Sequence, residues 1–187
     1  MRVFLDAGHG GTDPGAVFKR FREKDVTLAI VLELRRLMEA EGSKHVCSTS
    51  RMINKNVTLG DRVRLAKGEH ADVFLSVHCN ADPDDDAPGK PEASGAEVWV
   101  HPKSQGGHRL AKLIAEGFTE GFVGYPWRGI RESEHLYVLK VSPMTACLVE
   151  VGFIDSIHDA DFLSRPEVVT KIARLLLAAL DAFSAQP

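Results

Sequence analysis

Short runs of apolar residues recur along the chain, and each stops at glycine, proline or polar residues. Runs of this kind are typical of strands buried in a sheet that is covered on both faces. One of them, 44–49, is only weakly apolar. The predicted strands are Val3–Leu5, Lys44–Thr49, Asp72–His78, Ala96–His101, Leu136–Lys140 and Ala146–Phe153.

Segments with apolar residues at helical spacing lie between these strands. In the first of them Ile30 and Leu34 share one face, and Asp25 is placed to cap its start. Pro166 falls in the first turn of the last one, with Ser164 ahead of it as the expected cap. The predicted helices are Val26–Glu41, Thr58–Lys67, Ser104–Phe122 and a C-terminal helix that begins after Ser164.

Strands therefore alternate with helices, which favours the α/β class with a mostly parallel sheet. Two long segments lack either pattern: Ala81–Ser94, which is acidic and rich in proline and glycine, and Gly124–Glu134. We predict both as surface loops. Because the first begins soon after His78, we expect Asp82–Glu92 to form a loose rim of any cleft there. No repeat or linker divides the chain, so we expect one domain over residues 1–187.

The overall composition adds few constraints. A chain of 187 residues with 44% hydrophobic and 26% charged residues is ordinary for a globular domain. Its net charge of −3 gives no nucleic-acid footprint, and no apolar run reaches membrane-spanning length. The three cysteines, Cys47, Cys79 and Cys147, are too few and too far apart for a disulfide framework. We interpret them as buried small side chains.

Two histidines follow strong strands: His9, in a glycine cluster after the first strand, and His78, at the end of a later one. Ligands of open α/β sheets bind outside the carboxyl ends of strands, and imidazole is the commonest side-chain metal ligand. A single such histidine is more often structural, but the shared position favours a site. A catalytic zinc takes three protein ligands, and Glu23, ahead of the first helix, is the best third candidate. Taken alone, it would be an exposed glutamate at a helix start.

Glu150 lies inside the apolar run Cys147–Phe153. A carboxylate in such a run is costly to bury unless it is paired or functional. Desolvation would raise its pKa toward the range of a general base. An edge-strand glutamate facing water is the alternative, and the run alone leaves both interpretations open.

Four motifs, taken in order, resemble the zinc-dependent N-acetylmuramoyl-L-alanine amidases of the third amidase family, which are peptidoglycan hydrolases of bacteria and their phages. They are Asp6–Gly11 (DAGHGG) with Asp13–Ala16 (DPGA), Glu23, Ser76–Asn80 (SVHCN) and Leu148–Ile154 (LVEVGFI). The resemblance covers nearly the whole chain. It departs where Cys79 stands in place of the usual alanine, and where Thr49-Ser50-Arg51 replaces a Thr-Arg pair.

The resemblance implies that His9, Glu23 and His78 bind one Zn²⁺ per chain and that Glu150 is the catalytic glutamate. It also implies a twisted, mostly parallel sheet of about six strands with helices on both faces. The expected reaction is hydrolysis of the amide between N-acetylmuramic acid and L-alanine, with peptidoglycan as the partner. A zinc peptidase that cuts within the stem peptide is one alternative. A wall-binding module without activity is another, but all four site positions are filled.

Some relatives in this family carry an inserted helix that plugs the zinc site until an activator removes it. In this chain only Pro102–Ser104 separate the strand Ala96–His101 from the next helix. We therefore expect an open site that needs no activator, as in a phage endolysin or an autolysin, and a monomeric chain. The N-terminus enters a strand without a signal peptide. We expect action at the bacterial cell wall, either after release from the cytoplasm by lysis or as a mature secreted domain.

Overall fold

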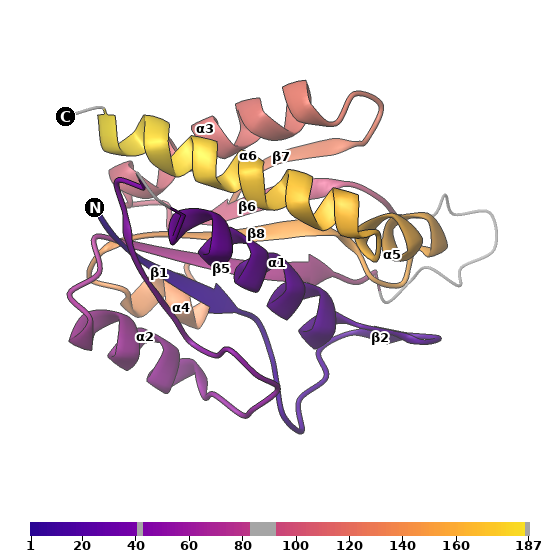
Figure 1. Ribbon diagram of the computed structural model, residues 1–187, viewed down its shortest axis with the longest axis horizontal. Helices are drawn as coiled ribbons and strands as arrows, with labels where there is room; N and C mark the ends of the chain where they lie inside the picture. The colour runs from indigo at the N-terminus through magenta and orange to yellow at the C-terminus, as the bar shows by residue number, and fades with distance from the viewer. Residues whose placement is uncertain (41–42, 83–92, 186–187) are drawn as a thin grey trace.

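The computed structural model describes residues 1–40, 43–82 and 93–185, and these form an α/β domain around one six-stranded sheet (Figure 1). Four strands are mutually parallel, β6 pairs antiparallel with β8, and β7 pairs parallel with β6. The strand order is β4-β1-β5-β8-β6-β7. The bounds are β1 (Arg2–Ala7), β4 (Val46–Thr49), β5 (Val73–Asn80), β6 (Ala96–Val100), β7 (Trp127–Glu132) and β8 (Thr145–Phe153). The predicted fold class is confirmed.

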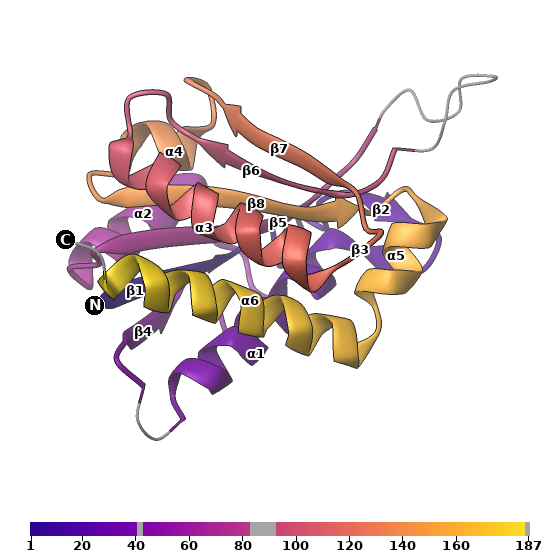
Figure 2. The same cartoon turned by 90° about the horizontal axis from the view of Figure 1, so that it is seen from above.

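Helices cover both faces of this sheet. The helices α1 (Glu23–Met38), α3 (Gln105–Gly121) and α6 (Pro166–Ala185) form one layer, in which α6 contacts both of the others (Figure 2). The opposite face carries the shorter helices α2 (Leu59–Gly68) and α4 (Tyr137–Val141). Helix α5 (Ile157–Leu163) follows β8, and a small hairpin of β2 (Val17–Phe18) and β3 (Phe21–Arg22) precedes α1.

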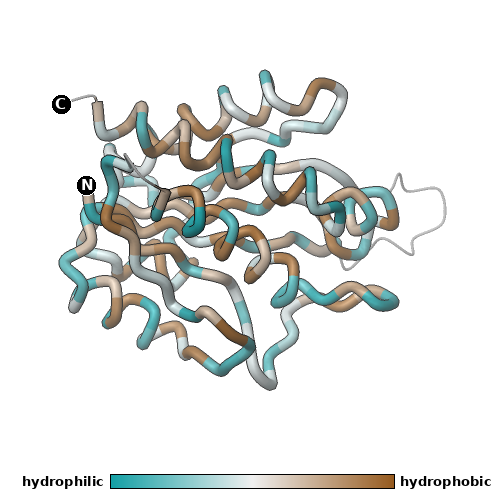
Figure 3. The backbone as a smooth tube through the Cα atoms, in the orientation of Figure 1, coloured by the Kyte–Doolittle hydropathy of each residue, from teal (hydrophilic) through white to brown (hydrophobic). Residues whose placement is uncertain are grey.

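The alternation of side chains along each strand divides the core in two. Leu5 and Leu75 are fully buried in the larger cluster, beneath α1, α3 and α6. Their neighbours Phe4 and Phe74 point to the other face and stack at 5.7 Å in the smaller cluster, beneath α2 and α4. Hydrophobic colouring accordingly recurs along the central strands, and it alternates with hydrophilic colouring along the helices (Figure 3). The smaller layer is short, so the carboxyl ends of β1, β5 and β8 extend beyond it.

Two sequence predictions were wrong, and both concern the far edge of the sheet. Trp127–Glu132, predicted as loop, is the edge strand β7, whose polar side chains are tolerated because they face solvent. Leu136–Lys140, predicted as a strand, instead forms the single-turn helix α4, which buries Val138 and Leu139. A short apolar run of this length cannot be assigned by periodicity alone.

The start of the first helix also differs from the prediction. It begins at Glu23, and Asp25 does not cap it. Its first backbone N–H groups donate instead to the carbonyls of Ala16 (3.0 Å) and Pro14 (3.1 Å). The preceding loop therefore takes the part of a capping side chain. Ser164 ends α5, and its hydroxyl donates to the carbonyl of Asp161. The predicted loop Asp82–Glu92 falls almost entirely in 83–92, outside the described residues.

Candidate metal and catalytic centre

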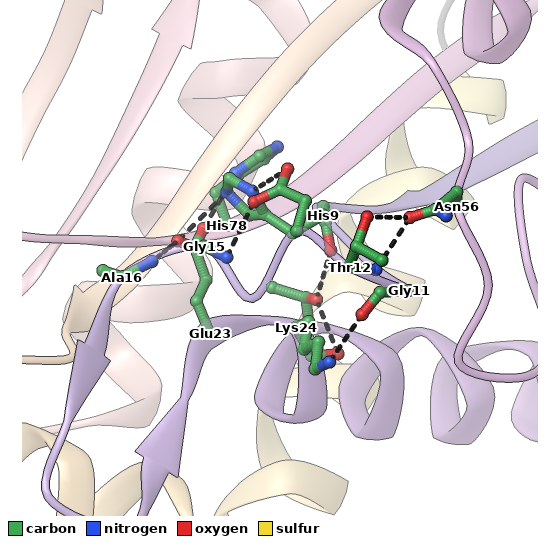
Figure 4. Close-up of polar contacts among 12 residues, drawn as sticks. His9, Gly11, Thr12, Gly15, Ala16, Glu23, Lys24, Asn56 and His78 are labelled. Carbon is green, nitrogen blue, oxygen red and sulfur yellow. Dashed lines mark hydrogen bonds and ion pairs between the residues drawn. The ribbon is translucent and has the colours of Figure 1, made fainter.

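Three side chains converge at the carboxyl ends of β1 and β5. His9 follows β1, His78 lies near the end of β5, and Glu23 is the first residue of α1 (Figure 4). One ligand atom from each lies within 4.8 Å of the others. Within the described residues, no other group of three histidine, cysteine or acidic side chains comes this close. The structure thus brings together the three residues that the sequence proposed as metal ligands.

The Glu23 carboxylate lies between the two imidazoles. Its Oε2 is 3.1 Å from Nε2 of His9, and its Oε1 is 2.9 Å from Nδ1 of His78. The backbone N–H groups of Ala16 and Cys79 donate to the same two oxygens, each at 3.0 Å. Glu23 is only 3% exposed. Its orientation is therefore fixed from four directions before any ion binds.

Two glycines are required by the close approach of these ligands. A Cβ atom on Gly8 would lie 2.5 Å from the His78 ring. A Cβ on Gly15, whose φ is +67°, would lie 2.5 Å from the Glu23 carboxylate and 2.7 Å from the His9 ring. Any larger residue at either position would displace a ligand, which explains why the loop after β1 is rich in glycine.

Cationic side chains hold the backbone carbonyls of that loop. Arg62 of α2 donates to the carbonyls of Ala7 (2.6 Å) and His9 (2.8 Å), and it pairs with the buried Asp6 carboxylate at 2.6 Å. Arg51 donates to the carbonyls of Ala7 and Gly8, at 3.1 and 2.8 Å. These contacts stabilise His9 in its left-handed conformation, with φ of 58°.

Lys24 and Thr27 complete the support from the first turns of α1. The Lys24 ammonium donates to the carbonyl of Gly11 at 2.8 Å (Figure 4), and the Thr27 hydroxyl donates to the carbonyl of Gly8 at 2.9 Å. Because Glu23 is on the same helix, the loop that carries His9 and the helix that carries Glu23 are tied together directly.

Asp13 orients the His9 ring. Its Oδ2 lies 2.8 Å from Nδ1 of His9, and its Oδ1 accepts from the backbone N–H of Gly15 at 3.0 Å. Nδ1 therefore donates to Asp13, and Nε2 faces Glu23 and His78. A carboxylate behind a metal-binding histidine fixes the tautomer and raises the basicity of the ring.

Glu150 lies beside this cluster on the neighbouring strand. It pairs with His78 in the parallel register of β5 and β8, so the two side chains project from the same face. Its Oε2 is buried and has no hydrogen-bond partner among the described residues. The pKa of Glu150 is raised to about 7: burial is the largest cause, His78 opposes it, and the nearby Glu23 and Glu97 add to it. It is a basic carboxylate without a structural partner.

The electrostatics of the three candidate ligands favour a bound cation. Although burial lowers the pKa of His9, its hydrogen bonds to Glu23 and Asp13 outweigh burial and raise the pKa to about 9. The pKa of His78 is also raised: burial lowers it, but the hydrogen bond to Glu23 and the nearby carboxylates of Glu150 and Asp6 together outweigh burial. Burial disfavours the Glu23 anion, but the two histidines hold its pKa below the usual range. Positive charge is thus stabilised between these groups, whether it comes from protons or from a metal ion.

The donor set fits a zinc ion, since two imidazoles and one carboxylate form a common catalytic zinc site. The Cys79 thiol takes no part. Its side chain is buried in the larger core cluster on the opposite face of β5, and burial raises the pKa of the thiol well above its usual range. The sequence-based interpretation of Cys79 as a buried small side chain agrees with this placement.

A hollow of about 500 Å³ opens next to His9 and His78, on the side of α2. Its wall includes the apolar side chains of Val57 and Leu59, and Leu59 is 54% exposed. A substrate can therefore reach the ligand cluster from solvent. Ligands, an unpartnered glutamate and an adjoining hollow at the ends of parallel strands are typical of a metal-dependent hydrolase.

Comparison with known proteins identifies the class further. The family model described as N-acetylmuramoyl-L-alanine amidase matches residues 3–182. The sporulation-specific N-acetylmuramoyl-L-alanine amidase of Bacillus subtilis is 32% identical over 93% of the chain, and the endolysin of Bacillus phage SPP1 is 32% identical over 91%. The chain spans 64% and 61% of the lengths of these two relatives.

The solved structure of N-acetylmuramoyl-L-alanine amidase AmiC2 of Nostoc punctiforme is similar throughout, with a TM-score of 0.89 and 27% identity. The match covers 100% of this chain and 98% of that one. The chain therefore belongs to the N-acetylmuramoyl-L-alanine amidase family of peptidoglycan hydrolases.

Several residues that shape this site were not assigned a part by the sequence. Asp13 was visible as the fourth residue after His9 in a turn, a spacing that lets a side chain reach back. Arg51 was noted only as part of a departure from the family's Thr-Arg pair. The contacts of Arg51 and Arg62 with the loop could not be foreseen, since they reach residues 43 to 55 positions away. Glu97, which pairs with Glu150 across β6 and β8, resembled an ordinary polar residue in a strand.

Proposed function

We propose that this chain hydrolyses the amide between the lactyl group of N-acetylmuramic acid and L-alanine, using one Zn²⁺ held by His9, Glu23 and His78. The observation that carries the proposal is the placement of the unpartnered Glu150 carboxylate directly beside a preorganised set of three ligands. When bound, the metal polarises the scissile carbonyl and makes a coordinated water more acidic. Among the residues that the structure describes, no second cluster of this kind could hold another ion.

Glu150 supplies the proton transfers. As a carboxylate with a pKa near neutrality, it accepts a proton from the attacking water. It then donates that proton to the nitrogen of L-alanine, which leaves as a neutral amine. A group whose pKa lies close to the working pH can do both, because neither protonation state is strongly favoured.

The protein's own residues keep this geometry fixed during the reaction. Asp13 holds the His9 ring, and the backbone donors at Ala16 and Cys79 hold Glu23. The hollow beside Val57 and Leu59 gives room for the part of the substrate on the α2 side. Catalysis by positioned groups loses efficiency when they shift by even about 1 Å, which accounts for the density of these contacts.

We also propose that the site works without an activator. Strand β6 ends at Val100 and α3 begins at Gln105, so only 101–104 connect them. In the part of the chain that the structure describes, no helix inserts between these two elements to cover the ligands. None of the described helices combines the length and apolar character needed to cross a membrane. We propose a monomer that acts directly on exposed wall, as an endolysin would.

The test is to digest purified peptidoglycan with the zinc-loaded protein alone and to identify the products by mass spectrometry. New L-alanine amino termini, with no new reducing sugar ends, support the proposal. New termini inside the stem peptide would instead indicate a peptidase. Absence of any product would contradict the proposed reaction. Products that appear only after a second protein is added would contradict the proposal that the site needs no activator. Glu150→Gln serves as the inactive control.

A further inference from the structure

A row of side chains crosses the sheet away from the metal ligands. His78 on β5 pairs with Glu150 on β8, Glu150 pairs with Glu97 on β6, and Glu97 pairs with Gly129 on β7. Partners in a sheet register project from the same face, so the row extends from the ligand cluster to the edge strand. A second carboxylate, Glu97, therefore lies beside the catalytic one.

Glu97 is buried and fully engaged. It is 4% exposed, and its Oε1 accepts from Nδ2 of Asn80 and from the indole N–H of Trp99, both at 3.0 Å. Its Oε2 faces two arginines of β7: Nε of Arg128 at 3.4 Å and Nε of Arg131 at 3.6 Å. A buried carboxylate so surrounded is a fixed anchor for cationic side chains.

The guanidinium groups of Arg128 and Arg131 differ in how freely they can bind a ligand. Arg128 also stacks on the Phe153 ring, 4.7 Å from its centroid, and reaches the carbonyl of Ser94. Arg131 is 49% exposed, and its terminal nitrogens have no hydrogen-bond partner among the described residues. Anchored through Nε alone, its guanidinium keeps the two-pronged edge that matches a carboxylate.

The sheet surface beside Arg131 is open. Gly129 adopts a φ of +106°, and a Cβ added to it would meet no atom within 4 Å. The row that starts at His78 thus ends in a stretch of edge strand with no side chain above it, bordered by a cation. The apolar hollow near Val57 lies on the other side of the ligand cluster, toward α2. The wall of that hollow includes both Asp13 and Arg62, so opposite charges occur there, whereas the β7 side of the site presents the Arg131 cation.

We propose that Arg131 binds a carboxylate of the stem peptide and orients the peptide half of the substrate along β6 and β7. This inference rests on the proposed amidase reaction. Once the lactyl group is amidated, the muramic acid half carries no charge, so the charged groups nearest the scissile bond belong to the peptide. The residue after L-alanine is a D-glutamate linked through its side chain, which leaves its α-carboxyl group free or amidated.

The dimensions agree with this assignment. Two strand spacings separate β8 from β7, about 10 Å, and the arginine side chain reaches back to within 3.6 Å of Glu97. The α-carboxylate of the second peptide residue lies within about 7 Å of the scissile nitrogen, two extended residue lengths. A substrate whose amide lies beside Glu150 therefore places that carboxylate within reach of Arg131.

The experiment compares two synthetic substrates, both N-acetylmuramoyl-L-alanyl-D-glutamate with the side-chain carboxyl group blocked as an amide: one has a free α-carboxylate, and the other has that group amidated too. The wild-type protein should show the higher kcat/KM on the free carboxylate. Arg131→Gln should lower kcat/KM on that substrate about tenfold, as expected for one lost charge-assisted hydrogen bond, and leave the amidated substrate unaffected. Arg131→Lys should restore part of the loss, and Arg131→Glu should reverse the preference.

Two controls make the outcomes distinct. Arg165→Gln removes another half-exposed, ion-paired arginine and should change neither substrate. In the Glu150→Gln background, calorimetry should show that Arg131→Gln weakens binding of the free carboxylate alone, without relying on turnover. The role of Arg131 would be overturned if Arg131→Gln and Arg131→Lys both lowered kcat/KM equally on the two substrates. It would also be overturned if Arg131→Gln lowered kcat/KM on neither substrate. Failure of the wild type to cut either substrate would instead overturn the amidase reaction itself.

Discussion

Glu150 lies directly opposite His78 across the parallel strands β8 and β5. Neighbouring strands are about 4.8 Å apart, so register alone places the unpartnered carboxylate beside a candidate metal ligand. A slip of one residue would turn Glu150 into the core beneath α1, α3 and α6. The position of the proposed base beside the candidate ligands thus depends on the pairing of β5 and β8, two strands that are separated in sequence by β6, α3, β7 and α4.

Replacing the proposed base should separate catalysis from metal binding. We expect Glu150→Gln to keep the fold and one zinc per chain, since glutamine is nearly isosteric and Glu150 has no hydrogen-bond partner to lose through Oε2. Activity on peptidoglycan should fall by about 10²–10⁴-fold, because the amide cannot accept the proton. Turnover close to that of the wild type would remove Glu150 from the mechanism.

Metal content should depend on the two histidines. His9→Ala and His78→Ala should each lose zinc and activity together, whereas His158→Ala, an exposed histidine of α5, should keep both. Elemental analysis of purified protein measures the metal, and the expected wild-type value is about one zinc per chain. A value near zero or two would show that the ligand set is misassigned.

Asp13 should affect the metal without touching it. We expect Asp13→Asn to weaken zinc affinity about tenfold or more, because the His9 ring loses the carboxylate that fixes its tautomer. Competition with a chromophoric chelator gives the affinity. Asp161→Asn, which changes a half-exposed aspartate with an ion pair, should behave as the wild type. Unchanged affinity in Asp13→Asn would mean that the loop backbone alone orients His9.

The buried pair of Arg62 and Asp6 should be structural. Their side chains are 4% and 1% exposed, and removing one partner of such a pair costs about 3–5 kcal/mol. We expect Arg62→Met to lower the free energy of unfolding by this amount, measured by urea denaturation. Arg64→Met, on the same helix but with a side chain 71% exposed in its own ion pair, should cost about 0–1 kcal/mol. Similar losses in both variants would contradict this distinction.

The metal-free protein should lose stability in mildly alkaline solution. The pKa of His9 is raised from 6.5 to about 9 in the folded chain, so its protonation stabilises the fold fully below pH 6.5 and ceases to do so as the pH rises through about 9. We expect the Tm of the zinc-free protein to fall over this interval. His9→Gln should show a smaller fall, and calorimetry at several pH values measures both.

Bound zinc should remove that pH dependence. The metal replaces the protons on the histidines, and a ligand that binds only the folded state stabilises it by mass action. The Tm of the zinc-loaded protein should therefore stay higher than that of the zinc-free protein at pH 9. A zinc-free protein whose Tm does not change between pH 6.5 and 9 would contradict the charge arrangement around His9.

Much of the site was predictable from local sequence. The strands that carry His9, His78 and Glu150 are short apolar runs bounded by glycine or polar residues, and such runs are visible in the local sequence. Because parallel strands end at a common edge, residues at their carboxyl ends were expected to meet. Glu23 follows less directly, since its first-turn position depends on the carbonyls of Pro14 and Ala16 rather than on a local cap.

What the sequence determined by itself was the class of fold and the side chains that could form a metal centre, because both depend on patterns within a few residues. Only the tertiary structure decided that β8 lies between β5 and β6, and therefore that Glu150 has His78 on one side and Glu97 on the other. It also turned 127–132 into an edge strand and 137–141 into a helix. These outcomes depend on which distant segments pack together. The free energy that favours one packing over another comes from burial and strand pairing across the chain rather than from the local residues.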